Sequence, residues 1–257
     1  MNTKASSLVA GALLLASKLQ AHDLWLTTVD NGAQLTATIN FGETNRRDLA
    51  TVARIFNVDV IDGKNVTSLR NGTFAEQQVN DGPVLVTQPF AKPGEGALLA
   101  ASYDSGYWVT TTQGMRNVSK RLYPEASASR WAVKFAKTLL GPGAYRAVLG
   151  QEMELTALED PFRLAPTQTL HVRVLLKGKP ITDAKLRILD GVTVMDPKDA
   201  KSVPTNANGI AAITLERRGL YVLAVEYDAP GANSQLADKD EYNSTLVFDL
   251  TSSGVAR

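Results

Sequence analysis

The chain has 257 residues, of which 27 are Lys or Arg and 26 are Asp or Glu, and its formal net charge is +1. These proportions are those of a globular protein and exclude a disordered or collagen-like chain. The near-neutral charge, without a dense basic stripe, indicates that nucleic acid is not a partner. The chain has no cysteine, which excludes disulfides, thiolate metal sites, a cysteine nucleophile and a lipoprotein anchor.

Residues 1–21 are predicted to be a secretory signal peptide. Lys4 gives the segment a positive start, an apolar stretch covers residues 8–16, and Ala21 ends a sequence that fits the small-residue cleavage signal. That stretch is too short to span a bilayer, and no later stretch approaches about 20 apolar residues. We therefore expect a periplasmic protein that does not insert into the membrane after cleavage.

Cleavage after Ala21 would make His22 the first residue of the mature chain. Its α-amine and its ring Nδ1 can then close a six-membered ring on a metal ion, because the α-amine pKa of about 7.7–8.0 lets a metal displace the proton near neutral pH. Nitrogen donors favour Cu(II), Ni(II), Co(II) or Zn(II). The alternative, that signal peptidase simply happens to leave a histidine first, stays open.

The mature chain begins with a pattern of short strands separated by turns. A hairpin is predicted around Asn31-Gly32, since Leu35, Ala37 and Ile39 alternate with polar or small neighbours. Each further strand candidate is bounded by Gly, Pro or Asn. These candidates are VARIFNVDVI, PVLVTQPF and GALLAASYDSGYWVTT.

A different pattern covers residues 127–140. Trp131, Phe135 and Leu139 recur at a spacing of four residues, while charged side chains lie between them, and Gly141 begins a Gly-Pro-Gly stop. This spacing predicts an amphipathic helix. We therefore expect a helical insertion near residues 125–140, with its aromatic residues in the core.

A second β pattern follows the predicted linker at Asp160-Pro161. Turn signals recur at regular spacing between strands such as TLHVRVLL, AAITL and LYVLAVEY, as in an immunoglobulin-like or transthyretin-like sandwich. The sequence therefore predicts a mainly β protein with two β-sandwich domains, at residues 22–159 and 162–251. The helical insertion would belong to the first domain.

Four stretches together resemble one family of periplasmic proteins. They are HDLWL, GYWVTTTQGMRNVSKRLYPEASASRWAVKFAKTLLG, LTALEDPFRLAP and the region from VRVLLKGKPITDAKLRI to LYVLAVEY. The chain resembles the DUF4198 family, whose members are often described as NikM-like nickel uptake components. This resemblance implies a β-rich protein that binds nickel or cobalt and works with a membrane metal-uptake system.

The resemblance also implies candidate ligands. The family's start places His22 at the mature terminus and Asp23 within the motif. Relatives often have a histidine where LYVLAVEY ends, whereas this chain has Glu226, a harder ligand for nickel or copper. His171 is a further candidate, because strand alternation turns it away from the apolar face of TLHVRVLL.

Three functions follow from these residues. The leading hypothesis is a non-enzymatic binder of nickel, cobalt or copper that assists metal uptake or delivery. The first alternative is an oxidative enzyme with a copper histidine brace, which requires His22 and His171 to meet on one ion. The second is a sandwich without metal, either structural or carbohydrate-binding, with Trp25, Tyr107 and Trp108 as the stacking aromatics.

One acidic run is not expected to bind metal. Asp238, Asp240 and Glu241 lie close together in ADKDEY, but their spacing differs from that of a calcium loop. We expect a solvated loop there.

Overall fold

The computed structural model describes residues 22–43, 46–190 and 200–251, and this part of the chain consists of strands, loops and four short 3-10 turns. The predicted signal peptide lies outside it. The expectation of a mainly β protein is confirmed, and no α-helix occurs among the described residues. None of their helical segments has the length and hydrophobicity needed to cross a bilayer.

The strands form three sheets, which we call the N-terminal, long and small sheets. In the N-terminal sheet the order is β1 (Asp23–Asp30), β2 (Gln34–Glu43), β7 (Gly82–Thr87) and β6 (Phe74–Val79), and β3 (Arg46–Arg47) and β8 (Phe90–Ala91) also pair with β2. The long sheet has the order β16 (Ser202–Pro204), β15 (Lys185–Leu189), β18 (Leu220–Pro230), β19 (Lys239–Asp249), β11 (Ala128–Leu139), β9 (Leu98–Thr111), β4 (Ile55–Asp62) and β5 (Asn65–Ser68), with β10 (Gly114–Arg116) paired to β9. The small sheet contains β12 (Met153–Ala157), β13 (Thr169–Leu176), β14 (Lys179–Pro180) and β17 (Ile210–Thr214). The 3-10 turns are Val52–Arg54, Lys120–Leu122, Ala144–Arg146 and Pro161–Arg163.

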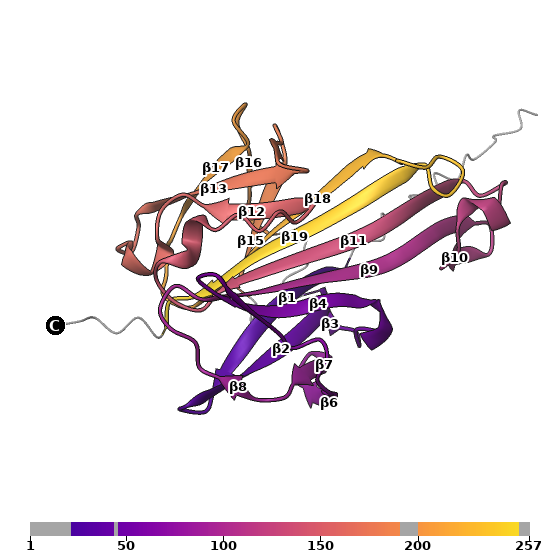
Figure 1. The fold of residues 1–257 in the computed structure, drawn as a ribbon. Helices are drawn as coiled ribbons and strands as arrows, with labels where there is room; N and C mark the ends of the chain where they lie inside the picture. The colour runs from indigo at the N-terminus through magenta and orange to yellow at the C-terminus, as the bar shows by residue number, and fades with distance from the viewer. Residues whose placement is uncertain (1–21, 44–45, 191–199, 252–257) are drawn as a thin grey trace, which may run out of the picture.

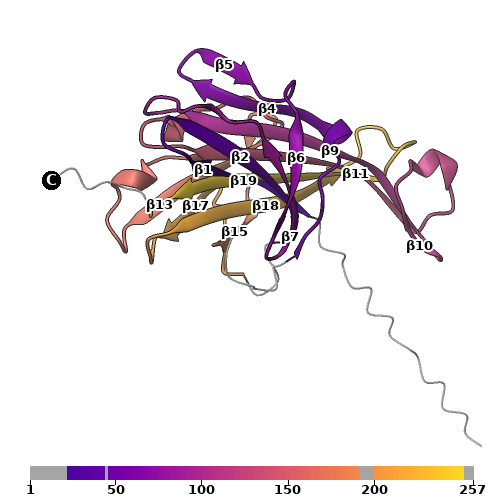
Figure 2. The ribbon, with the colours of Figure 1, turned by 90° about the horizontal axis from the view of Figure 1, so that it is seen from below.

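The long sheet is the middle layer of the molecule. Figure 1 shows it running diagonally between the small sheet above and the N-terminal sheet below. Seen from below, β1 and β2 cross the strands of the long sheet (Figure 2). The two outer sheets therefore cover opposite faces of the long sheet.

Side chains along the strands of the long sheet alternate between its two faces and contribute to two separate hydrophobic cores. On β11, Val133 and Phe135 face the small sheet and join a cluster with Leu155 and Val172, whereas Ala136 joins the cluster of the N-terminal sheet. This division follows from the period of two, which sends neighbouring side chains to opposite faces. Burial of both faces explains why β11 is almost entirely inaccessible over its second half.

The predicted helix at residues 125–140 is wrong, because this segment is strand β11. The spacing of four between Trp131, Phe135 and Leu139 is a multiple of the strand period as well as close to one helical turn, so these residues share a face in either structure. The lysines in this segment also favoured a helix, because they would form its polar face. Lys134 and Lys137 are 2% and 1% exposed, so they do not form the polar face of a helix.

β11 also connects the two halves of the sequence. It pairs antiparallel with β9 and parallel with β19, a strand more than 100 residues later in the chain. The long sheet thus takes strands from both sides of the predicted boundary near residues 160–161. The division into two sandwich domains remains a prediction.

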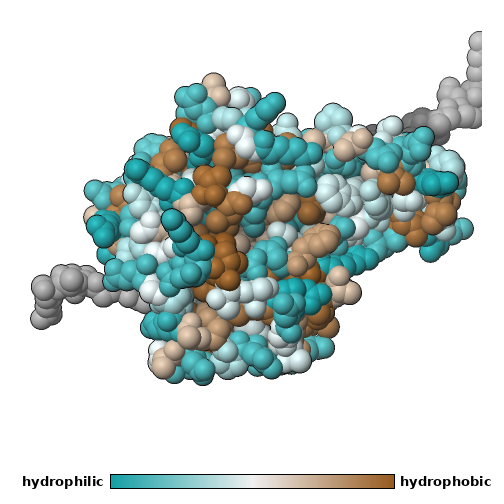
Figure 3. All heavy atoms as spheres, viewed as in Figure 1, coloured by the Kyte–Doolittle hydropathy of each residue, from teal (hydrophilic) through white to brown (hydrophobic). Residues whose placement is uncertain are grey.

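The face seen in Figure 1 is largely hydrophilic. Hydrophobic side chains gather there in a narrow band between the small sheet and the N-terminal sheet, and in a patch near β10 (Figure 3). The two outer layers thus leave little apolar area uncovered on this face.

Candidate metal centre

Two threonines of the long sheet hold β1 in place. Thr138 Oγ1 donates to the Leu26 carbonyl at 2.9 Å, and Thr245 Oγ1 donates to the Leu24 carbonyl at 2.6 Å. Both bonds are buried, where an unpaired carbonyl would cost about 1–3 kcal/mol. They fix the start of β1, and with it His22, over β11 and β19.

A buried ion pair fixes the first residue of β1. Asp23 is 3% exposed, and Arg187 Nη2 of β15 lies 2.8 Å and 3.0 Å from its two carboxylate oxygens. Charge-assisted bonds of this kind are strong and short. Asp23 therefore already has a cationic partner.

His22 lies half-buried beside this pair. Its ring packs 5.1 Å from the ring of Phe41, and its Nε2 is 2.8 Å from Asp48 Oδ2. Burial lowers the pKa of the imidazole and nearby Lys134 lowers it further, while Asp48 partly offsets this. The ring is therefore neutral near pH 7, as a metal ligand must be.

The contact with Asp48 also selects the tautomer of the ring. A carboxylate only accepts hydrogen bonds, so Nε2 of the neutral ring carries the proton and Nδ1 carries the lone pair. No hydrogen bond to Nδ1 is seen within the described part of the chain. Nδ1 is the nitrogen that can close a chelate ring with an α-amine on the same residue.

A buried lysine lies among the acidic side chains next to His22. Lys134 of β11 points to the face covered by β1, with its Nζ 6.0 Å from the centre of the Phe41 ring. Burial lowers the pKa of Lys134, and Glu241, Asp23 and Glu226 oppose this by favouring its charged form. Lys134 thus lies in a site rich in carboxylates.

Glu226 lies on the same face of the long sheet. Part of its side chain reaches the surface, but desolvation of the carboxyl by surrounding protein atoms raises its pKa to about 7. The neighbouring Glu241 carboxylate raises it further and Arg187 partly offsets this. Carboxylate oxygens of Glu226, Asp228 and Glu241 lie within 4.8 Å of one another.

The structure does not bring His171 to this group. His171 lies on β13 of the small sheet, where its Nδ1 is 3.0 Å from Glu159 Oε1 and its backbone N–H donates to Glu159 Oε2 at 2.7 Å. The small sheet covers one face of the long sheet and β1 covers the other. The long sheet therefore separates His171 from His22.

His22, Asp23 and Glu226 thus lie in one charged cluster, which also contains Asp48, Lys134, Arg187, Asp228, Glu241 and the amide of Asn243. His171, the fourth predicted site residue, lies outside it. Sequence reasoning missed Asp228 and four further members of the cluster: Asp48, Lys134, Arg187 and Asn243. No local pattern identifies them, because each reaches the cluster through strand pairing or packing. The alternation of Glu226 and Asp228 was the one available signal that two acids share a face.

The prediction of a solvated loop at the acidic run was wrong for two of its residues. Asp240 and Glu241 lie on β19 and are 4% and 6% exposed. Asp240 accepts a hydrogen bond from the Ala232 N–H, and Glu241 Oε2 is 2.9 Å from Arg130 Nε. Pairing with β18 and β11 buries these acids in the sheet.

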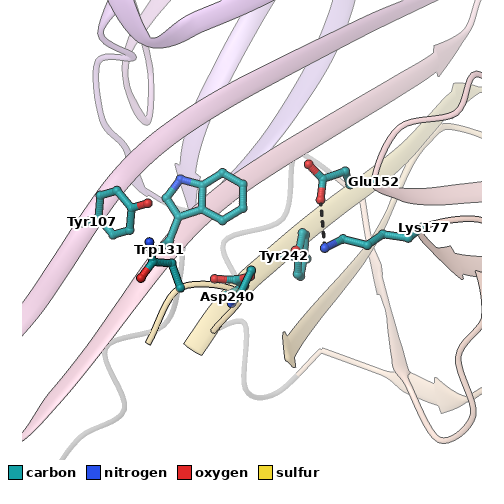
Figure 4. Close-up of a pocket in the computed structure, with 8 residues that line it drawn as sticks. Tyr107, Trp131, Glu152, Lys177, Asp240 and Tyr242 are labelled. Atoms are coloured by element: carbon teal, nitrogen blue, oxygen red, sulfur yellow. Dashed lines mark hydrogen bonds and ion pairs between the residues drawn. The ribbon is translucent and has the colours of Figure 1, made fainter. Parts of the chain in front are cut away.

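A separate pocket of about 280 Å³ lies on the other face of the long sheet (Figure 4). Its aromatic residues are Tyr107, Trp131 and Tyr242, and Glu152 and Lys177 lie at its border, joined by an ion pair of 3.5 Å. Of the aromatics proposed for sugar stacking, only Tyr107 lines this pocket; Trp25 is fully buried against β15, β18 and β19.

Comparisons with known proteins identify the family but no activity. No curated protein matches the chain. A solved structure described as "Anomalous substructure of Titin-A168169" is similar over 88% of this chain and 96% of its own, with 9% identity and a TM-score of 0.19. Residues 19–229 match the family described as "Domain of unknown function (DUF4198)". Because this match covers most of the sequence, the chain belongs to the DUF4198 family.

Proposed function

We propose that the protein is a non-enzymatic periplasmic carrier of a transition-metal ion, with His22 as the main ligand after removal of residues 1–21. The metal is nickel, cobalt or copper, and the carrier delivers it to a membrane uptake system. The α-amine and Nδ1 of His22 hold the ion as a chelate. Nitrogen donors of this kind suit these metals better than calcium or magnesium.

The observation that supports this proposal most is the contact between His22 Nε2 and Asp48, at 2.8 Å. In metal sites a ligating histidine commonly donates its second N–H to a carboxylate, which fixes the ring and raises its basicity. Asp48 is the carboxylate that accepts the N–H of His22 Nε2, the ring nitrogen that the chelate does not use. The ring is thus held in the tautomer and orientation that the metal requires.

The surrounding carboxylates support a cationic cargo. Asp23 is engaged by Arg187, so we assign it the role of fixing β1. Glu226 remains a candidate carboxylate, because Lys134 lies close enough to act on both Glu226 and His22. A copper brace with His171 gains no support from this arrangement, since the two histidines lie on different layers. Water completes the coordination of the ion.

The test is a calorimetric titration of Cu(II), Ni(II), Co(II) and Zn(II) into protein purified from periplasm, with the N-terminus verified by mass. A matched variant carries one extra alanine before His22, which converts the amine into a peptide N–H. We expect tight binding that the extension weakens by at least a hundredfold. Equal affinity with and without the extra alanine would place the site elsewhere in the protein, and the absence of binding would refute the proposal.

A second candidate function is carbohydrate binding at the pocket of Figure 4, favoured by its aromatic residues and by the polar side chains of Glu152 and Lys177 beside them. Aromatic faces and polar groups together are typical of sugar sites. Titration of mono- and oligosaccharides, monitored by tryptophan fluorescence, tests it. Binding weakened by Tyr107→Ala would support this candidate, and an unchanged spectrum would exclude it.

A further inference from the structure

A row of side chains across three neighbouring strands lines the pocket of Figure 4. Tyr107 of β9 is the register partner of Trp131 on β11, and Trp131 is the register partner of Asp240 on β19. Register partners on adjacent strands point to the same face of a sheet, and so does Tyr242, two residues after Asp240. The pocket of about 280 Å³ therefore combines three aromatic rings with one buried acid.

The aromatic rings present faces in more than one direction. The rings of Trp131 and Tyr242 are nearly perpendicular, at 86°, with their centres 6.2 Å apart. Figure 4 shows Trp131 between Tyr107 and Tyr242. Trp131 Nε1 donates to Asp104 Oδ1 at 2.9 Å, which holds the indole in this orientation. Aromatic faces carry partial negative charge and attract a cation within about 6 Å of the ring centre, so these walls suit a positive ligand.

Asp240 is a buried carboxylate without a cationic partner. It is 4% exposed, and no Lys, Arg or His nitrogen of the described residues lies within 4.0 Å of its oxygens. Within the same part of the chain, the only hydrogen bond of this carboxylate is the one that Oδ2 accepts from the Ala232 N–H at 3.0 Å. Burying a carboxylate without a counter-charge is costly. A cation bound in the pocket would offset this cost.

The lysine at the border of the pocket does not supply that counter-charge. Lys177 pairs with Glu152 at 3.5 Å, and its Nζ lies 5.4 Å from the centre of the Tyr242 ring. Its contact with the Tyr242 side chain raises the pKa of Lys177, and Glu152 raises it further, so the lysine stays charged. Because Lys177 and Glu152 balance each other, the charge of Asp240 remains.

We propose that this pocket binds a small organic ammonium ion of the size of choline, with its charge beside Asp240 and its methyl groups against the aromatic rings. A metal ion would require several oxygen ligands, whereas an organic cation requires one counter-charge and apolar contact. A neutral sugar would leave the Asp240 charge unbalanced. The inference therefore goes beyond the carbohydrate candidate for the same pocket.

The inference does not rest on the His22 chelate. The pocket lies on the face of the long sheet that the small sheet covers, and His22 lies on the other face. The protein with an extra alanine before His22 should therefore bind the ammonium ion as the wild type does. Failure of the transition-metal chelate and failure of this pocket are thus distinguishable.

The experiment titrates choline into the mature protein and measures the heat of binding and the tryptophan fluorescence. The matched probe is the neutral tert-butyl analogue of choline, in which a carbon atom replaces the nitrogen. The two probes have the same shape, and only choline carries a charge. We expect choline to bind and the neutral analogue to bind about tenfold more weakly or not at all.

Variants of the lining test the assigned roles. Asp240→Asn keeps an acceptor for the Ala232 N–H but removes the charge, so it should weaken choline binding about tenfold. Lys177→Gln removes a like charge beside the ligand and should strengthen binding. Tyr107→Leu removes one aromatic face and should weaken it. Glu216→Gln, at an exposed acid outside the pocket, is the matched control and should leave binding unchanged.

Equal affinity for choline and its neutral analogue would overturn the proposal, and this comparison needs only the wild-type protein. An affinity for choline that is unchanged in Asp240→Asn, or weakened in Lys177→Gln, would overturn it as well. Binding of neutral oligosaccharides without any binding of choline would also overturn it and would favour the carbohydrate candidate. Thermal unfolding of each variant shows whether it is folded at the titration temperature.

Discussion

Arg187 Nη2 contacts both carboxylate oxygens of Asp23, at 2.8 Å and 3.0 Å, across 164 positions of sequence. This pair joins the first residue of β1 to β15, a strand of the long sheet. It therefore helps to fix the position of His22, the residue that precedes β1.

Replacing Arg187 should destabilise the fold strongly. Arg187→Met leaves the buried Asp23 carboxylate without its partner, and breaking such a pair costs about 3–5 kcal/mol. Urea unfolding at pH 7 measures the loss. Lys201→Met breaks an exposed pair with Glu216 and serves as the control. Equal losses in the two variants would contradict the role assigned to Arg187.

The two buried lysines of β11 should differ in their contribution to stability. Lys137 Nζ is 2.5 Å from Glu154 Oε1 and donates to the carbonyls of Ala147 and Leu155 at 2.7 Å and 3.1 Å. Lys137→Met removes all three contacts and leaves the buried Glu154 carboxylate without its cationic partner, so we expect a loss of about 3–5 kcal/mol in the free energy of unfolding.

Lys134→Met is the matched control, because Lys134 points to the opposite face and forms no hydrogen bond to another described residue. Its loss in urea unfolding should be clearly smaller. A larger loss for Lys134→Met than for Lys137→Met would contradict the conclusion that Lys137 contributes more to stability than Lys134.

Gly209 is required by both its backbone conformation and its surroundings. Its φ is +69°, and a Cβ there would lie 2.8 Å from Pro180 Cβ and 2.9 Å from the Val174 carbonyl oxygen. Gly178 has a similar φ of +75° but nothing within 4 Å. Gly178→Ala should therefore cost about 1 kcal/mol from backbone strain, and Gly209→Ala about 1–3 kcal/mol more from overpacking. Thermal unfolding of both variants measures the difference, and identical Tm values would argue against the predicted clash.

Asp48 should control metal affinity without controlling the fold. Its side chain is 48% exposed, so Asp48→Ala should leave the Tm nearly unchanged. Loss of the carboxylate that orients His22 should weaken Cu(II) or Ni(II) binding about tenfold to a hundredfold in a competition titration. Asp30→Ala, at an exposed acid elsewhere, should not affect binding. An unchanged affinity in Asp48→Ala would mean that the chelate forms without this carboxylate.

Much of the secondary structure was predictable from local pattern. The hairpin around Asn31-Gly32 is β1 and β2, and the second-half strands are where alternation and turn residues placed them. The segment 128–139 was not predictable in this way. Its apolar residues recur every four positions, which fits the period of a helix as well as that of a strand. Only the pairing of this segment with β9 and β19 makes it a strand.

For the candidate site, the sequence by itself determined the chemistry of single residues. His22 follows a predicted cleavage signal, Asp23 is its neighbour, and Glu226 lies near the end of a predicted strand. Only the tertiary structure decided that His171 lies on another layer, that Arg187 pairs with Asp23, and that Glu241 and Asn243 join Glu226. The physical reason is that alternation assigns a side chain to a face, whereas its neighbours depend on which strands pair and in which register, and these contacts lie up to 221 positions apart in the chain.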